Sequence, residues 1–200
     1  MATDLSVRAQ EAVATAQSAV ANTFRVDTVD GKGMGALAVR EIVVGETICL
    51  ETPLLKLTPD GAGRYDATYP VYERELAREL LSTLDRAAAA PSGGQLLDDV
   101  VNTNGIQVVR DEGTFSVTHL LLSRLNHSCL PNSKFEWCDE LEQGRIYAIE
   151  HINQGHEITF NYGATGSLEE RSQFLERFAF RCACCRCEAE RSATTNSVPS

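Results

Sequence analysis

The residues with the most varied chemistry lie together in the segment RLNHSCLPN, residues 124–132. Four consecutive positions carry an amide, an imidazole, a hydroxyl and a thiol: Asn126, His127, Ser128 and Cys129. Pro131 then ends any helix. Because four such side chains cannot all belong to an apolar core, neighbouring ones must face different surroundings. We expect Asn126 and His127 to face a small-molecule pocket, and Cys129 to face the cysteines near the C-terminal end.

The composition limits the class of protein. Two hundred residues with a hydrophobic fraction of 43% suit one compact globular domain with appendages. No apolar run approaches the roughly 20 residues that span a bilayer. Residues 1–23 lack the basic and the continuous apolar regions of a secretory signal. We therefore expect an intracellular protein, in the cytosol or the nucleus, without a membrane partner.

The formal net charge of −10 bears on partners. It argues against sequence-independent binding of nucleic acid, which requires clustered Lys and Arg side chains. A negative surface attracts a basic substrate, such as a lysine-rich peptide, through long-range electrostatics. An acidic surface that only keeps the protein in solution is the open alternative.

Four of the seven cysteines form one short run near the C-terminal end: Cys182, Cys184, Cys185 and Cys187. In an intracellular chain, clustered thiols point to a metal site more than to disulfides. Cys49 and Cys138 lie in strand-like segments, so we expect them in the core.

The hydrophobic pattern predicts a β-rich domain interrupted by helices. Residues 1–23 indicate a marginal helix or a partly disordered arm, and strands follow from residue 24, with a turn at Gly45-Glu46. Residues 56–70 have the composition of a loop, residues 71–90 predict a strong helix, and a short helix follows at 95–101. Residues 56–102 are therefore interpreted as a mostly helical insertion.

The second half of the chain alternates more regularly. It predicts a short strand within 104–113 and a helix or buried segment before Asn126. Three strands are expected at residues 133–138, 145–150 and 157–161, and a short amphipathic helix after Gly166. The last residues, 188–200, are polar and predict a disordered tail.

Three segments in this order, GKGMG, RLNHSCLPN and GHEITFNYG, resemble the motifs of SET-domain protein lysine methyltransferases, closest to the SET and MYND domain subfamily. The ending FRCACCRC resembles their zinc-binding post-SET segment. The resemblance covers about residues 24–187, with a SET domain over 24–180 and a post-SET segment over 181–187. Residues 50–60 carry no Cys/His array, so the MYND insertion of that subfamily is missing, as is its helical C-terminal domain.

The resemblance implies a β-rich α+β SET fold, with short sheets and a threaded pseudoknot that brings Tyr162 beside Asn126. It also implies that Cys129 joins Cys182, Cys184 and Cys187 as the fourth ligand of a structural zinc ion. Cys185 is then a spare thiol that could replace a neighbour. Reduced structural cysteines without a metal are the alternative.

The resemblance further implies that the chain binds S-adenosylmethionine. The residues expected around this cofactor are Lys32, Gly33, Met34, Gly35, Asn104, Ser123, Asn126, His127, Tyr162 and Phe180. Phe180 is expected to pack on the adenine, and Ile106 and Phe180 to form walls of the substrate channel. Outside its motif, His127 would be interpreted as an ordinary core histidine. His156 departs from the family, which usually has an acidic residue there.

By the same resemblance, Tyr162 is the catalytic tyrosine, and the reaction is transfer of a methyl group to a lysine side chain of a protein. Such a displacement depends mainly on alignment of the amine in a narrow channel, and no dedicated acid–base residue is needed. Two alternatives stay open. One is a SET fold that acts on a small molecule in biosynthesis, and the other is a cofactor-binding or interaction module without turnover.

Overall fold

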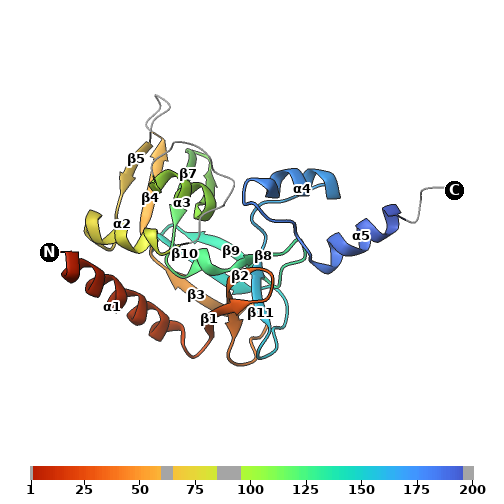
Figure 1. The fold of residues 1–200 in the computed structure, drawn as a ribbon, viewed down its shortest axis with the longest axis horizontal. Helices are drawn as coiled ribbons and strands as arrows, with labels where there is room; N and C mark the ends of the chain where they lie inside the picture. The colour runs from red at the N-terminus through yellow and green to blue at the C-terminus, as the bar shows by residue number, and fades with distance from the viewer. Residues whose placement is uncertain (1, 60–64, 85–95, 196–200) are drawn as a thin grey trace.

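The computed structural model describes residues 2–59, 65–84 and 96–195, and it shows short β-sheets with helices at their margins (Figure 1). The strand orders are β1-β2-β11-β8, β3-β10-β9 and β5-β4-β7-β6. The strands are β1 Phe24–Val29, β2 Gly33–Ala38, β3 Thr47–Glu51, β4 Leu55–Pro59, β5 Tyr65–Thr68, β6 Ile106–Arg110, β7 Gly113–Thr118, β8 Asn126–His127, β9 Ser133–Cys138, β10 Gln143–Ala148 and β11 Glu157–Phe160. The helices are α1 Ala2–Val20, α2 Arg74–Ser82, α3 Leu96–Asn104, the 3₁₀ helix η1 Leu122–Arg124, α4 Leu168–Glu176 and α5 Cys185–Thr195. The expected β-rich α+β architecture is confirmed.

The first sheet joins segments that are far apart in the sequence. β8 runs parallel to β11, with Asn126 opposite Thr159 and His127 opposite Phe160. On its other edge, β11 pairs with β2, which carries the glycine motif. This sheet therefore brings all three sequence motifs side by side, and Tyr162 follows two residues after β11.

The second sheet contributes Ile48, Cys49, Ile146 and Ala148 to the central core. Along β10, alternate residues are buried, as the period of a half-buried strand requires: Gly144, Ile146 and Ala148. Ile146 and Ala148 pack with apolar residues from β2, β3, β11 and the segment before β8. The strands predicted at 133–138, 145–150 and 157–161 are observed, with shifts of one or two residues at the ends of the last two.

The third sheet corrects the prediction of a loop at the start of the helical insertion, while helices α2 and α3 lie in the rest of it. Residues 56–70, expected as a loop, contribute strands β4 and β5, because Leu55 and Leu57 pair with β7. Pro59 is tolerated because it is the last residue of β4, at the end of the ladder with β5. The predicted helix over 71–90 is observed over Arg74–Ser82, and residues 85–90 of that prediction lie outside the described residues.

Helix α1 and helix α2 cover this part of the molecule. Of the two alternatives for residues 1–23, the structure shows the helix over Ala2–Val20. One face of α1 packs into a second core with α2 and the start of β4, through Leu5, Ala9 and Val13. None of the helices described has both the length and the apolar character needed to cross a membrane.

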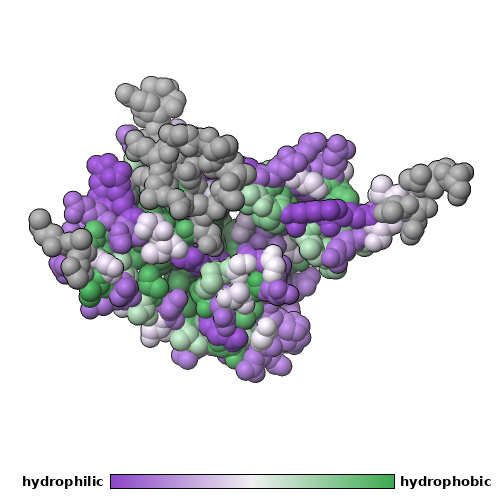
Figure 2. Space-filling view, viewed as in Figure 1, coloured by the Kyte–Doolittle hydropathy of each residue, from purple (hydrophilic) through white to green (hydrophobic). Residues whose placement is uncertain are grey.

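The C-terminal segment also differs from the prediction. Residues 188–195, expected as part of a disordered tail, belong to α5, while 196–200 lie outside the described residues. Glu190 explains the order, because it accepts hydrogen bonds from Arg171 at 2.6 Å and from Arg186 at 2.9 Å. Helices α4 and α5 extend away from the sheets (Figure 1). The side of the molecule that Figure 2 shows is mainly hydrophilic.

Candidate active site

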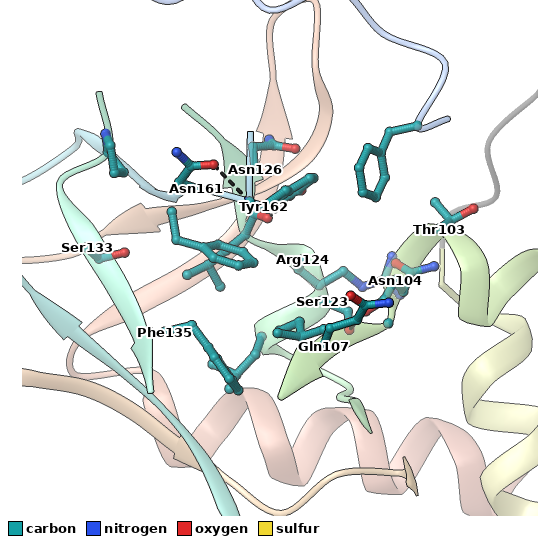
Figure 3. A pocket seen from close by; sticks show the side chains of 18 of the residues that line it. Thr103, Asn104, Gln107, Ser123, Arg124, Asn126, Ser133, Phe135, Asn161 and Tyr162 are labelled. Carbon is teal, nitrogen blue, oxygen red and sulfur yellow. Dashed lines mark hydrogen bonds between the residues drawn. The ribbon is translucent and has the colours of Figure 1, made fainter. Parts of the chain in front are cut away.

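A cavity of about 730 Å³ lies where the first sheet meets η1, β6 and the segment after β11. In Figure 3, Asn126 and Tyr162 form one wall, and Asn104, Gln107 and Ser123 face them. Of the residues expected at the cofactor or substrate, eight line it: Lys32, Met34, Asn104, Ile106, Ser123, Asn126, Tyr162 and Phe180. One cavity therefore gathers side chains that are separated by up to 148 positions in the sequence.

The glycine motif lies directly against Asn126. A Cβ atom at Gly35 would come within 2.8 Å of the Asn126 amide nitrogen and 2.5 Å of a Val29 methyl group, so only glycine fits. The Asn126 amide donates to the carbonyl oxygen of Met34 at 3.1 Å and to Glu157 at 2.8 Å. These contacts fix the orientation of the Asn126 side chain on the cavity wall.

Glu157 was not among the predicted site residues, although it begins a predicted strand. Its carboxylate accepts from Asn126 and also forms a 2.5 Å ion pair with the Lys32 ammonium group. The carboxylate is largely covered, with a side-chain exposure of 15%, while Lys32 is 40% exposed. Glu157 therefore holds both Asn126 and Lys32 at the mouth of the cavity.

Tyr162 is held by hydrogen bonds on both sides of Asn126. Its hydroxyl group donates to the carbonyl oxygen of Leu125 at 2.8 Å, and its backbone N–H donates to Nδ1 of His127 at 3.2 Å. Its ring lies 5.0 Å from the rings of Phe160 and Phe178, measured between centroids. The tyrosine is thus fixed within an aromatic wall, with its hydroxyl oxygen beside β8.

His127 is buried behind Tyr162. Its second ring nitrogen, Nε2, lies 3.2 Å from the sulfur of Cys129. Burial, with the positive charges of Lys32 and Arg171, lowers the pKa of His127 to about 4, so the ring is neutral at pH 7. Since Nδ1 accepts a hydrogen bond from Tyr162, the ring proton must be on Nε2, facing Cys129.

Four thiols meet on the far side of His127. The sulfur atoms of Cys129, Cys182, Cys184 and Cys187 lie within 4.8 Å of one another, and Cys185 is exposed on α5 outside the group. Burial raises the pKa of Cys129. Burial acts in the same direction on Cys184, but backbone and side-chain hydrogen bonds from the other cysteines together outweigh it and lower the pKa of that thiol to about 6.

Arg171 is a cation beside these thiols that the sequence did not single out. Its side chain is 1% exposed, and its guanidinium group contacts the Cys187 sulfur at 3.6 Å, Glu190 at 2.6 Å and the Gly166 carbonyl at 2.7 Å. The hydrogen bond to Glu190, followed by that to Cys187, raises the pKa of Arg171. A buried positive charge at this place favours thiolates over thiols.

Phe180 lies at the edge of the cavity, two residues before Cys182. Its ring centroid is 6.0 Å from that of His127, and 38% of the residue is exposed. The preceding Ala179 has a φ of +58°, the left-handed conformation that usually takes glycine after a helix. This turn after α4 directs the chain from the cavity toward the thiols.

Asn132, at the end of the RLNHSCLPN segment, is a third residue that was not among the predicted site residues. Its amide donates to the Glu157 carbonyl at 2.8 Å, and its side-chain oxygen accepts from the Thr159 N–H at 2.9 Å. Both partners belong to β11, so Asn132 acts as a side-chain substitute for a neighbouring strand. It fixes the strand that carries Glu157 and leads to Tyr162.

Comparison with known proteins gives matches over most of the chain. The SET domain model matches residues 33–163. The histone-lysine N-methyltransferase set5 of Schizosaccharomyces pombe is 32% identical over 171 residues, which make up 84% of this chain and 51% of that protein. A SET and MYND domain-containing protein of Dictyostelium discoideum is 35% identical over 34% of this chain and 20% of its own length. The protein-lysine N-methyltransferase SMYD4 of Pongo abelii is 34% identical over 46% of this chain and 11% of its own length.

This chain spans about half the length of the fission yeast protein and smaller shares of the other two. The matches confirm the expected relationship to SET and MYND proteins. Residues 50–60 contain neither Cys nor His, and only residues 52–54 separate β3 from β4, which is consistent with the expected lack of a MYND insertion there.

Replacement of Asn132 by alanine tests its role as a clamp. Asn132→Ala removes both side-chain hydrogen bonds to β11, and we expect a loss of about 1–3 kcal/mol for each backbone group left unpaired. The free energy of unfolding in urea measures it. Asn153→Ala, at an exposed turn before the same strand, is the control and should change stability little. Equal stability of the two variants would contradict the clamp.

Proposed function

We propose, since the chain belongs to the SET domain family, that it is an S-adenosylmethionine-dependent methyltransferase that modifies a lysine side chain of a protein. The observation that carries this proposal is the position of Tyr162 in the cavity wall beside Asn126 and the glycine motif. Relatives with named activities are lysine methyltransferases. The net charge of −10 suits a basic protein substrate.

The cavity has features that fit the cofactor. Its volume of about 730 Å³ is within the range of small-molecule sites. Gly35 lets the backbone of β2 approach Asn126, and the Phe180 ring offers an exposed aromatic surface. We propose as cofactor-binding the residues expected from the sequence: Lys32, Gly33, Met34, Gly35, Asn104, Ser123, Asn126, His127, Tyr162 and Phe180. For His127 the contact is proposed through its backbone, because both ring nitrogens already contact protein atoms.

S-Adenosylmethionine supplies a methyl group bonded to a positively charged sulfur. The chain must hold the lysine amine in line with that methyl group, and alignment of this kind accounts for much of the available acceleration. Tyr162 is suited to this task because its hydroxyl position is fixed by Leu125 at 2.8 Å. Ile106 and Phe180 are proposed as walls of the channel. The aromatic rings around Tyr162 exclude water from this part of the cavity. Because water is excluded, oxygen atoms of the protein orient the amine.

Titration with S-adenosylmethionine, followed by methyl-transfer assays, tests the function. We expect saturable binding by calorimetry and transfer of labelled methyl groups to lysine residues of histones or lysine-rich peptides. Small amines form the second set of acceptors. If methyl groups are transferred to small amines alone, the substrate is a small molecule and not a protein. If S-adenosylmethionine does not bind, the proposed methyltransferase activity is wrong.

Removal of one hydroxyl group tests the role of Tyr162. Tyr162→Phe keeps the aromatic contacts, and we expect kcat to fall by about 100-fold, because an oriented polar group is lost from the reacting centre. Cofactor Kd, measured by calorimetry, should change little. Tyr147→Phe, on β10, is the matched control and should retain activity. Parallel losses of kcat and cofactor affinity would mean that Tyr162 is only structural.

We further propose that Cys129, Cys182, Cys184 and Cys187 hold a structural zinc ion. With Zn–S bonds of about 2.3 Å, sulfur atoms at the corners of a tetrahedron lie about 3.8 Å apart. The Cys129 sulfur lies 3.9 Å from that of Cys182 and 3.5 Å from that of Cys187, which fits this geometry. The N–H of His127 and the cation of Arg171 suit thiolate ligands.

Metal analysis of cysteine variants tests the zinc site. We expect one zinc ion per chain, loss of that zinc in Cys129→Ser, and retention in Cys185→Ser, whose thiol lies outside the cluster. Cys129→Ser should also weaken cofactor binding, because the chain between Phe180 and Cys182 is no longer fixed. Melting curves before and after chelation provide a second measurement. Full zinc content in Cys129→Ser, or equal loss in both variants, would contradict the assignment.

A further inference from the structure

Glu51, the last residue of β3, makes an unusual set of contacts with the segment that precedes β8. Its carboxylate accepts hydrogen bonds from three consecutive backbone amides, those of Leu120 at 2.9 Å, Leu121 at 3.0 Å and Leu122 at 2.9 Å. These partners are 69–71 positions away in the sequence. The contacts join the second sheet to the start of η1.

The carboxylate is suited to these amides. Backbone N–H groups at the start of a helical turn have no partner within the turn, so a side chain must supply one. Hydrogen bonds to an ionised acceptor are stronger than those between neutral groups. Burial raises the pKa of Glu51 to about 7, and the three amide hydrogen bonds act against that rise. The position of η1 therefore depends on a carboxyl group that belongs to another sheet, and that group accepts most strongly when it is ionised.

The turn transmits this position to the cavity. The N–H of Leu125 donates to the Leu122 carbonyl at 3.2 Å, and the carbonyl of Leu125 accepts from the Tyr162 hydroxyl at 2.8 Å. Leu122 and Leu125 are 0% and 1% exposed, so neither can shift without disturbing the central core. A continuous path of hydrogen bonds runs from Glu51 through Leu122 and Leu125 to Tyr162.

Glu51 is itself firmly placed. Its backbone pairs with Gly144 in the ladder between β3 and β10, and the neighbouring Cys49 is part of the central core. The chain after β3 turns directly into β4, and β4 pairs with β7. β7 ends two residues before Leu120. The carboxylate is therefore a fixed reference point for the turn.

We propose that Glu51 is a positioning residue for Tyr162: its carboxylate holds η1 so that the Leu125 carbonyl fixes the direction of the Tyr162 hydroxyl group. The effect of Glu51 on catalysis rests on the proposed methyl transfer. Its effect on the position of the Tyr162 hydroxyl group does not. Glu51 itself lies behind η1 and acts only through the turn.

A fluorine label on Tyr162 tests the structural part without any activity. We replace Tyr162 by 3-fluorotyrosine and record its ¹⁹F resonance in the otherwise unaltered chain, in Glu51→Gln and in Glu46→Gln. Gln has the shape of Glu, but its NH₂ group cannot accept the amide hydrogen bonds. Glu46 is a matched control because its carboxylate also accepts from a backbone N–H, that of Val43, but at a turn remote from Tyr162. We expect a shifted or broadened resonance only in Glu51→Gln.

Kinetics test the catalytic part. In Glu51→Gln we expect kcat to fall by about 10- to 100-fold, because a small misplacement of a reacting group slows a reaction on this scale. The change in cofactor Kd should be smaller. In a Tyr162→Phe background the same substitution should cause little further loss, because both changes remove the action of one hydroxyl group. If Glu51→Gln does not fold, Glu51→Asp, which keeps the charge but shortens the side chain, is measured in the same ways.

The outcomes separate this proposal from the proposed function. An unchanged ¹⁹F resonance in folded Glu51→Gln, or equal kcat losses with and without the Tyr162 hydroxyl group, would overturn the role of Glu51. Absence of methyl transfer in the unaltered protein would overturn the proposed function instead, and the ¹⁹F spectra would still decide whether Glu51 positions Tyr162.

Discussion

The two ring nitrogens of His127 impose the constraint on which both sites depend. One accepts the backbone N–H of Tyr162, and the other lies 3.2 Å from the Cys129 sulfur. A neutral imidazole has one proton, so acceptance at Nδ1 places the donor at Nε2. The cysteine must therefore act as an acceptor, which a thiolate does better than a thiol. The same ring thereby links the state of the cysteine cluster to the backbone of Tyr162.

This link is possible only because β8 and β11 pair in parallel. The pairing aligns His127 with Phe160 and leaves Tyr162 just beyond the end of the strand. Asn132 binds two backbone groups of β11. Glu157 of β11 in turn accepts a hydrogen bond from the Asn126 side chain of β8. A two-residue strand is too short to be stable by itself, so these side-chain hydrogen bonds substitute for a longer ladder.

The sequence predicted the residues at the centre of the site because their chemistry is concentrated in short motifs. Asn126, Tyr162 and Phe180 line one cavity, and four of the five cysteines considered meet. The role of Glu51 could not be predicted, because its three amide partners are about 70 positions away. In the sequence, nothing distinguishes Glu51 from other acidic residues at the ends of strands. Asn132 was within a quoted motif, but its partners are backbone groups that only the fold brings near.

The errors in secondary structure have the same origin. Residues 56–70 carry prolines and glycines typical of a loop, yet Leu55 and Leu57 form a strand, because β7, some 60 positions later, offers a ladder, and residues of α1 and α2 form the core against which they pack. Residues 188–195 are polar enough to predict disorder, but Glu190 is held by the buried Arg171. In both cases local composition was outweighed by one distant partner, and only long-range contacts identify that partner.

The cavity and the cysteine cluster therefore form a single unit. Phe180 lies on the cavity wall, and Cys182 lies in the cluster two residues later, so the chain between them has little freedom. Ala179 takes a left-handed conformation just before this connection, which costs of order 1 kcal/mol for a residue with a side chain. This connection has α4 before it and the cysteine cluster after it. Phe180 therefore connects the wall of the cavity directly to the cysteine cluster.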